Sequence, residues 1–160
     1  MNWQSWLLWG FVATVALTTV MAGSQGVRLT RMNLPYMLGA MFTPSRDRAR
    51  IIGFGVHLLN GWVFSLGYVA AFQSWGRATW WAGAALGLLQ ALFVLTVIAP
   101  LLPAVHPRMA SEQKGPTVTR QLEPPGFFAL NYGVQTPVSI VLGHLIYGAI
   151  LGACYSLPGK

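Results

Sequence analysis

Four apolar stretches, each long enough to cross a lipid bilayer as a helix, alternate with more polar connections in this chain. They cover residues 6–22, 51–72, 80–102 and 137–156. The hydrocarbon core of a bilayer is about 30 Å thick and is crossed by about 20 helical residues. Backbone polar groups find no water there, so such stretches must close their hydrogen bonds internally as helices. The sequence therefore predicts an all-α fold: an integral membrane four-helix bundle in a single transmembrane domain, residues 1–160.

The composition points to lipid, and not to water or nucleic acid, as the surroundings. The chain is 54% hydrophobic and only 8% charged, whereas about 25% of the residues of a soluble domain are charged. Ten Lys and Arg residues against three acids give a net charge of +7. Because these basic residues lie between the apolar stretches, anionic lipid headgroups are their expected partners, and no nucleic acid is expected. The first stretch has neither a preceding basic segment nor a cleavage site, which indicates a retained anchor.

The distribution of basic residues predicts the orientation in a bacterial inner membrane. Eight of the ten lie in the connections 23–50 and 103–136, and the opposite side has Arg77 and Lys160. The positive-inside rule places both long connections in the cytoplasm and both termini in the periplasm. The arginines of the first connection are predicted to contact lipid headgroups or a partner: Arg28, Arg31, Arg46, Arg48 and Arg50. An aromatic belt is expected at the outer interface: Trp3, Trp6, Trp75, Trp80 and Trp81.

Each long connection contains a short apolar segment, residues 31–42 and 125–134, which is predicted to be either an interfacial helix or a packed loop. In the first segment Asn33 is the predicted N-cap and Pro35 lies in the first turn. The dipeptides Thr43-Pro44 and Thr136-Pro137 are then predicted to begin the second and fourth long helices, with the threonine as N-cap. His106 follows the third apolar stretch and is predicted to be solvated.

One motif occurs in both the second and the fourth apolar stretch. Its copies are His57, Leu58, Gly61 and Tyr68, and His144, Leu145, Gly148 and Tyr155. Such a repeat predicts two helical hairpins of the same design, related by a two-fold axis along the membrane normal. Small residues at four-residue spacing let helices approach closely in lipid. The predicted helix-packing residues are Gly61, Ser65, Gly83, Gly87, Gly148 and Gly152.

His57 and His144 are the only ionisable side chains well inside the apolar stretches, and such a group marks a functional site by default. In an up-down bundle their helices are diagonal, so both imidazoles reach the centre. One interpretation is a cofactor site for haem b or for a chlorophyll-type pigment. The other is that each neutral imidazole bonds a neighbouring helix and sets the packing register. The second is favoured, since neutral histidine is the least costly ionisable group to bury and the bundle leaves little room for a macrocycle.

Three segments resemble those of a broad family of small bacterial four-helix inner-membrane proteins. They are the threonine-containing segment 13–21, the run Asn33-Leu34-Pro35-Tyr36-Met37-Leu38-Gly39, and the two histidine motifs. The resemblance covers most of the chain except residues 111–124. It implies the four-helix fold and transfers no activity.

Signatures of an enzyme or a pump are missing from the sequence. The apolar stretches contain no Asp, Glu, Lys or Arg, and the chain has no Ser/His/Asp set, CxxC, HExxH, P-loop or dinucleotide fingerprint. We therefore expect a non-catalytic accessory or scaffold subunit that packs against other integral membrane subunits of a respiratory or photosynthetic complex. Bound lipid is expected, and no cofactor or metal ion is required. The alternatives are a cofactor protein that uses His57 and His144 as ligands, and an oligomeric small-molecule permease.

Overall fold

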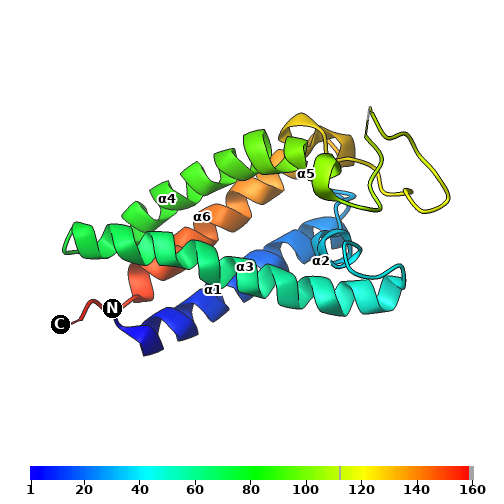
Figure 1. Cartoon of the computed structure of the whole chain (residues 1–160). Coiled ribbons are helices and arrows are strands. Elements are labelled where there is room, and N and C mark those ends of the chain that lie inside the picture. Colours follow the sequence, from blue (N-terminus) through cyan, green and yellow to red (C-terminus); the bar gives the residue numbers. More distant parts are fainter. Residues whose placement is uncertain (112, 159–160) are drawn as a thin grey trace.

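The computed structural model describes residues 1–111 and 113–158, and Lys160 lies outside these residues (Figure 1). The predicted all-helical fold with four long apolar helices is confirmed. Helices α1 (Trp3–Gly26), α3 (Arg46–Ser74) and α6 (Thr136–Cys154) are three of them. The fourth spans Trp80–Val105 and consists of α4 (Trp80–Phe93), the π-helix η1 (Val94–Ile98) and α5 (Ala99–Val105). All four are long and apolar enough to cross a membrane.

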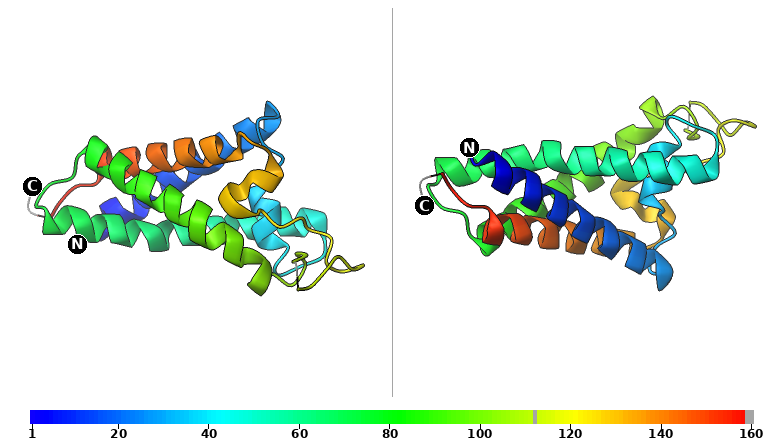
Figure 2. Two further views of the ribbon diagram at one scale, coloured as in Figure 1. Left: turned by 90° about the horizontal axis from the view of Figure 1, so that it is seen from above. Right: turned by 90° about the horizontal axis from the view of Figure 1, so that it is seen from below.

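The four long helices form a bundle that is open on one side. Helix α6 packs along α4 and α1, and α1 packs on α3. Helices α3 and α4 are joined by the short turn 75–79, diverge from it, and do not pack along their length (Figure 1). Both termini lie at the end of the bundle that holds this turn, and both long connections lie at the opposite end (Figure 2). The order around the bundle is therefore α3, α1, α6, α4, with an opening between the first and the last.

Glycines allow the backbones of α4 and α6 to touch. A Cβ atom added at Gly83 would lie 1.9 Å from the Gly148 carbonyl oxygen, and one added at Gly148 would lie 2.0 Å from the Gly83 carbonyl oxygen. One turn further along, a Cβ at Gly87 would lie 2.1 Å from the carbonyl oxygen of His144. No side chain fits between the two helices at these points, so the contact depends on the absence of one.

The π-helix η1 interrupts the span formed by α4 and α5. The Ala99 N–H bonds to the Val94 carbonyl oxygen five residues earlier, which is the π pattern. Pro100 follows directly and has no N–H to donate to the Thr96 carbonyl oxygen, so a regular α-helical ladder cannot continue here. Such π-turns are frequent at functional sites, because they widen the helix and redirect its side chains.

The first connection folds back on the bundle. Helix α2 (Leu34–Gly39) begins as predicted, with the Asn33 side chain accepting the Tyr36 N–H at 2.9 Å. It is shorter than residues 31–42 and packs closely on α3. A Cβ at Gly39 would lie 1.7 Å from the Ala49 carbonyl oxygen, and one at Gly53 would lie 1.7 Å from that of Pro35. The second connection contains the irregular 3-10 segment η2 (Phe127–Tyr132).

Both predicted threonine caps are wrong. Helix α3 begins at Arg46 with Ser45 as its N-cap residue, and Thr43 instead accepts the Ser45 N–H at 3.3 Å. At α6 the N-cap residue is Gln135, and the Thr136 hydroxyl lies 2.7 Å from that of Thr30. The Thr43 hydroxyl thus caps a local turn before the helix, and the buried Thr136 hydroxyl finds its partner in a distant part of the chain.

The prediction that His106 is solvated is also wrong, because its side chain is only 3% exposed. Its Nε2–H donates to the Met37 carbonyl oxygen at 2.9 Å, and its Nδ1 accepts the Arg108 N–H at 3.1 Å. Both ring nitrogens therefore have partners, and the imidazole joins the end of α5 to α2. The chain turns at Pro107 and covers the ring, which a local reading of the sequence does not reveal.

Acid is expected to weaken the fold through His106. Burial lowers the pKa of this imidazole, and the nearby Arg108 guanidinium acts in the same direction. Below about pH 6.5 the unfolded chain takes up a proton and the folded chain does not. The free energy of unfolding therefore decreases as the pH is lowered, by up to about 1.4 kcal/mol per pH unit. We expect the thermal unfolding midpoint in mild detergent to be lower at pH 5.5 than at pH 7.5. The decrease should be smaller in His106→Gln. Equal slopes in the two proteins would contradict this role.

Candidate functional site

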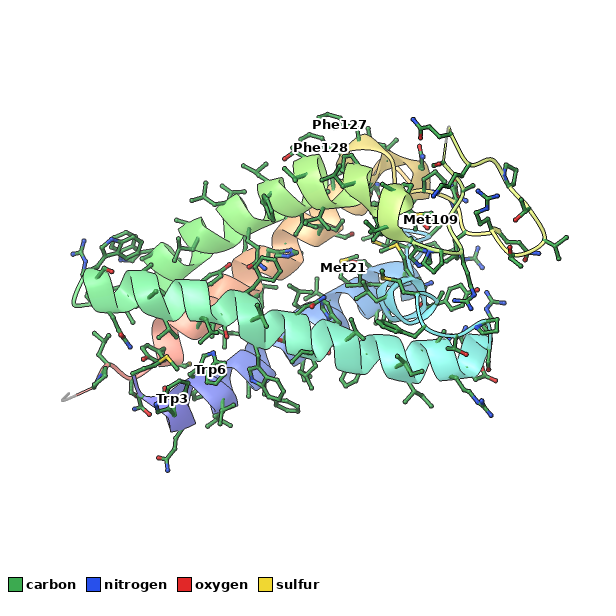
Figure 3. The ribbon with its side chains drawn as sticks, in the orientation of Figure 1. Trp3, Trp6, Met21, Met109, Phe127 and Phe128 are labelled. Atoms are coloured by element: carbon green, nitrogen blue, oxygen red, sulfur yellow. The ribbon has the colours of Figure 1, made fainter. Side chains whose placement is uncertain are left out.

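A cavity of about 250 Å³ lies in the centre of the bundle and is called the central cavity below. Side chains from α1, α2, α3, α4, η1, α5 and α6 line it, so it is built from nearly every helix. Most are apolar: Leu17, Met21, Met32, Leu34, Met37, Leu38, Phe64, Val94, Ile98, Ala99, Leu102, Pro125 and Ile140. Met21 is seen between the helices in Figure 3. Asn60 and Phe64 of α3 are exposed, so the cavity reaches the surface where α3 and α4 diverge.

His57 and His144 both line the central cavity. His57 Nδ1 lies 2.9 Å from the Thr18 hydroxyl oxygen on α1. That hydroxyl donates its single proton to the Thr14 carbonyl oxygen at 2.7 Å, so toward His57 it can only accept. The proton of the neutral His57 ring is therefore assigned to Nδ1, and Nε2 keeps an unshared lone pair.

The same reasoning assigns the proton of His144. Its Nδ1 lies 2.8 Å from the carbonyl oxygen of Ile140, one turn earlier in α6. A carbonyl oxygen can only accept, so the neutral ring again carries its proton on Nδ1. Neither Nε2 atom has a hydrogen-bond partner among the residues that the structure describes. Neither of the two atoms is fully buried. Two residues that line the cavity thus each carry an acceptor nitrogen that the protein does not use.

The other polar groups of the site are held by the protein. Tyr147 is fully buried and its hydroxyl donates to the Gly61 carbonyl oxygen at 2.5 Å. The Tyr68 hydroxyl donates to Gln90 Oε1 at 2.6 Å, which leaves the Gln90 amide hydrogens free. Asn60 makes no hydrogen bond through its side chain within the described part of the chain. No carboxylate, lysine or arginine is among the described residues that line the central cavity, so the site is polar but uncharged.

The donor atoms fit a haem or chlorophyll-type cofactor, but the space does not. Two neutral imidazoles are the axial ligands of a b-type haem. However, pockets for drug-sized molecules range from about 300 to 1,000 Å³, and this cavity is about 250 Å³. A planar macrocycle would require the bundle to open. Among the described residues there is also no group of three or more His, Cys, Asp and Glu side chains that would hold a metal ion.

The predicted packing residues lie at helix–helix contacts. A Cβ at Gly61 would lie 1.9 Å from the Thr14 hydroxyl oxygen, and Ser65 accepts the indole N–H of Trp6 at 2.8 Å. The others lie between α4 and α6: Gly83, Gly87, Gly148 and Gly152. Tyr155, in the second copy of the motif, lies at the opposite end from the connections and bonds the Asn2 N–H at 3.3 Å. The copies of the motif therefore share the histidine position and differ in their contacts.

The predicted headgroup arginines all lie at the connection end. Arg31 pairs with Glu123 at 3.2 Å, and the Arg46 guanidinium lies 5.5 Å from the centre of the Tyr36 ring. Arg50 lies 3.8 Å from Asp47, and Arg28 and Arg48 are exposed. Pairs this exposed contribute little to stability. A cavity of about 230 Å³ borders the following arginines of the set: Arg31, Arg46 and Arg50.

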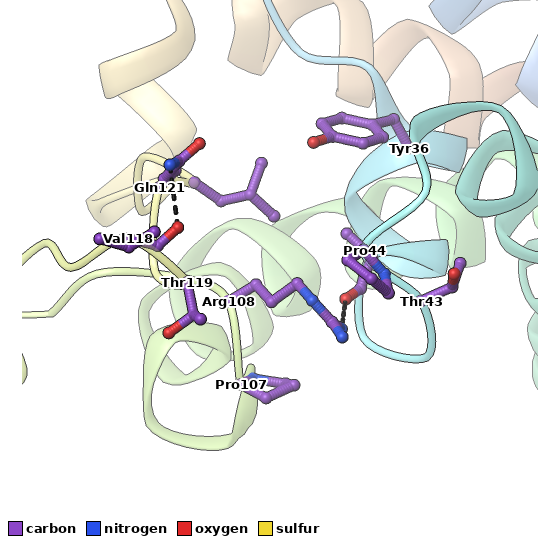
Figure 4. Close-up of a pocket in the computed structure, with 10 residues that line it drawn as sticks. Tyr36, Thr43, Pro44, Pro107, Arg108, Val118, Thr119 and Gln121 are labelled. Atoms are coloured by element: carbon purple, nitrogen blue, oxygen red, sulfur yellow. Dashed lines mark hydrogen bonds between the residues drawn. The ribbon is translucent and has the colours of Figure 1, made fainter.

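The connections enclose a further cavity of about 530 Å³, shown in Figure 4. Arg108 reaches across it and donates to the Ala40 carbonyl oxygen at 2.5 Å, which joins the second connection to the end of α2. Gln121 donates to the Val118 carbonyl oxygen at 2.9 Å. Arg108 is the only charged side chain among the described residues that line this cavity, and its contact is with backbone. This cavity therefore belongs to the packing of the connections.

Sequence reasoning missed several residues of the central cavity. Asn60 lies one turn from His57 on the same helix and is not among the predicted site residues. Met32 and Met37 come from the first connection, and only its return to the bundle brings them to the cavity, so no local signal identifies them.

No protein-family model matches this chain, and neither a curated protein nor a solved structure matches it. The resemblance to small four-helix inner-membrane proteins rests on the sequence motifs alone. The function must accordingly be argued from the central cavity.

Proposed function

We propose that this chain is a multi-pass protein of the bacterial inner membrane that holds a neutral, membrane-soluble molecule in its central cavity. The observation that carries the proposal is the pair of unused Nε2 lone pairs in uncharged, mostly apolar surroundings. A polar atom in such surroundings costs free energy when it has no partner. A bound molecule that supplies the partner relieves that cost.

The outward-facing side chains support the membrane location. Large apolar residues are widely exposed along the long helices, including Ile51 at 75%, Leu89 at 63% and Val138 at 66%. Apolar surface on this scale suits lipid and not water. Exposed tryptophans gather at the end that holds the termini: Trp3, Trp75, Trp80 and Trp81. The basic connections at the other end support an orientation with that end in the cytoplasm and both termini in the periplasm.

The opening between α3 and α4 is the proposed entry route. In the repeat, α1 with α3 forms one hairpin and α4 with α6 forms the other. A strict two-fold relation would match the α1–α6 contact with an equal contact between α4 and α3, but α3 and α4 do not pack along their length. A membrane-soluble molecule would therefore enter sideways from the bilayer, past the exposed Asn60 and Phe64.

Filling the central cavity is expected to remove the bound molecule. Val94 lines the cavity from η1, whereas Val97 in the same π-helix is exposed and does not line it. We expect wild-type protein, purified from its own membranes in mild detergent, to carry a neutral lipophilic compound detectable by native mass spectrometry. Val94→Trp should lose it and the matched Val97→Trp should keep it. Equal occupancy in both variants, with unchanged elution as folded protein, would refute the proposed site.

The accessory-subunit role remains a proposal that the cavity does not exclude. A chain of 17.4 kDa with almost no soluble portion is suited to packing against larger membrane subunits, in a respiratory or photosynthetic complex. The native mass in mild detergent tests it: a large particle with defined partners supports a subunit, and a lone chain counts against one. Ion transport is disfavoured, since no permanently charged side chain is among the described residues that line the cavity.

A further inference from the structure

The polarity of the central cavity specifies which neutral molecules it accepts. We infer that the ligand is a hydroxyl donor: a lipophilic alcohol, phenol or quinol whose O–H donates to the Nε2 of His57 or His144. This inference rests on the proposed function, because it names the ligand class of the same cavity.

The hydrogen bonds to Nδ1 fix the role of each ring. His57 Nδ1–H can only donate to the Thr18 hydroxyl, whose own proton is committed to Thr14. His144 Nδ1–H can only donate to a backbone carbonyl oxygen. The other tautomer of His144 would place two lone pairs against each other at 2.8 Å, and the other tautomer of His57 would take the Thr18 proton away from the Thr14 carbonyl oxygen. Each Nε2 is therefore held as an acceptor, and an acceptor needs a donor from outside the protein.

In the structure no other group of the site supplies that donor, since the amide hydrogens of Asn60 and Gln90 are bonded to neither ring. The hydroxyl protons of Tyr68 and Tyr147 are both donated elsewhere, to Gln90 and to Gly61. The charged partners that would hold an imidazolium are also lacking, since the described carboxylates Asp47 and Glu123 do not line the cavity. The two rings are consequently neutral acceptors.

A ligand with carbonyl groups alone suits this pair of acceptors poorly. A quinone, ketone or ester could accept from the Asn60 or Gln90 amide but would leave both Nε2 atoms unsatisfied. Burying an unsatisfied polar atom costs free energy, and sites built around a hydroxyl reject analogues that lack it. The volume of about 250 Å³ admits a single ring with a short substituent, and a longer tail would leave between α3 and α4.

A matched pair of probes tests the inference on the full-length protein in lipid nanodiscs. We would measure the binding of 4-hexylphenol and of 4-hexylanisole, which share ring and chain and differ by the methyl group that replaces the hydroxyl proton. The phenol is expected to bind at least tenfold more tightly than the ether. In the double variant His57→Leu/His144→Leu this preference should shrink toward one, while the affinity for the ether stays within about twofold.

The outcomes separate the two proposals. Equal affinity for both probes, abolished by Val94→Trp, would overturn the donor inference and support the binding site. Failure of both probes to bind to wild-type protein would overturn the binding site itself. A measurement on wild-type protein tests the inference even if the variants fail to fold. Nitrogen-15 NMR of labelled histidines should show a protonated Nδ1 and an unprotonated Nε2 for His57 and His144. Protonated Nε2 atoms would overturn the donor inference.

Discussion

Replacing Gly83 with alanine is expected to destabilise the fold by about 3 kcal/mol or more. The added methyl group would lie 1.9 Å from the Gly148 carbonyl oxygen, and the atom it meets belongs to a helix backbone that cannot rotate away. Overpacking in a protein interior costs about 1–3 kcal/mol when flexible side chains can yield, and here α4 must separate from α6. The thermal unfolding midpoint in mild detergent should therefore fall clearly.

A control from the same bundle separates this contact from a general effect of removing glycine. Nothing lies within 4 Å of a Cβ atom added at Gly67 in α3. Gly67→Ala should be neutral or stabilising by up to about 1 kcal/mol, because alanine favours the helix. Gly148→Ala meets the Gly83 carbonyl oxygen at 2.0 Å and should behave like Gly83→Ala. If Gly83→Ala unfolds with the wild-type midpoint, the close α4–α6 contact does not exist.

Replacing Gly53 with alanine is expected to release α2 from α3, again at a cost of about 3 kcal/mol. The new methyl group would lie 1.7 Å from the Pro35 carbonyl oxygen, and Gly39 makes the reciprocal contact with Ala49. Leu34 and Met37 line the central cavity, so displacement of α2 also opens the end of the cavity beside the connections. We expect a lower unfolding midpoint together with faster proteolysis in residues 27–45.

Gly55 provides the matched control for this contact. It lies in α3 two residues beyond Gly53, and an added Cβ meets nothing within 4 Å. Gly55→Ala should leave the unfolding midpoint at or above that of the wild type. Its proteolysis should be no faster than that of the wild type. Similar losses in the two variants would show that the helix tolerates alanine poorly in general and that the α2 contact is not the cause.

Local patterns predicted the elements of the fold and the centre of the site. Hydropathy and length identify the four long helices, because each helix satisfies its own backbone and needs no information from its neighbours. The Asn33 cap was predictable because it is also a local interaction: the Asn33 side chain accepts the N–H of Tyr36, only three residues further along the chain. His57 and His144 were predictable as a pair because two buried imidazoles stand out in apolar stretches, and both line the central cavity.

The contacts between elements were not predictable in this way. His106 is buried by Met37, which precedes it by 69 residues, and Thr136 finds Thr30 across 106 residues. The opening between α3 and α4, although a short turn joins them, follows from the closer fit of α4 on the glycines of α6. The acceptor role of each histidine likewise depends on which atoms Thr18 and Ile140 place beside Nδ1.

The sequence by itself thus determined that this chain forms four apolar helices, with a paired histidine motif on two of them. The tertiary structure alone decided which helices touch, where the bundle stays open, and which nitrogen of each histidine has no partner among the described residues. The physical reason is the range of the interactions. Apolar character and backbone bonding act within one helix, whereas in lipid, helix pairing depends on close backbone fit and a few polar contacts between distant residues.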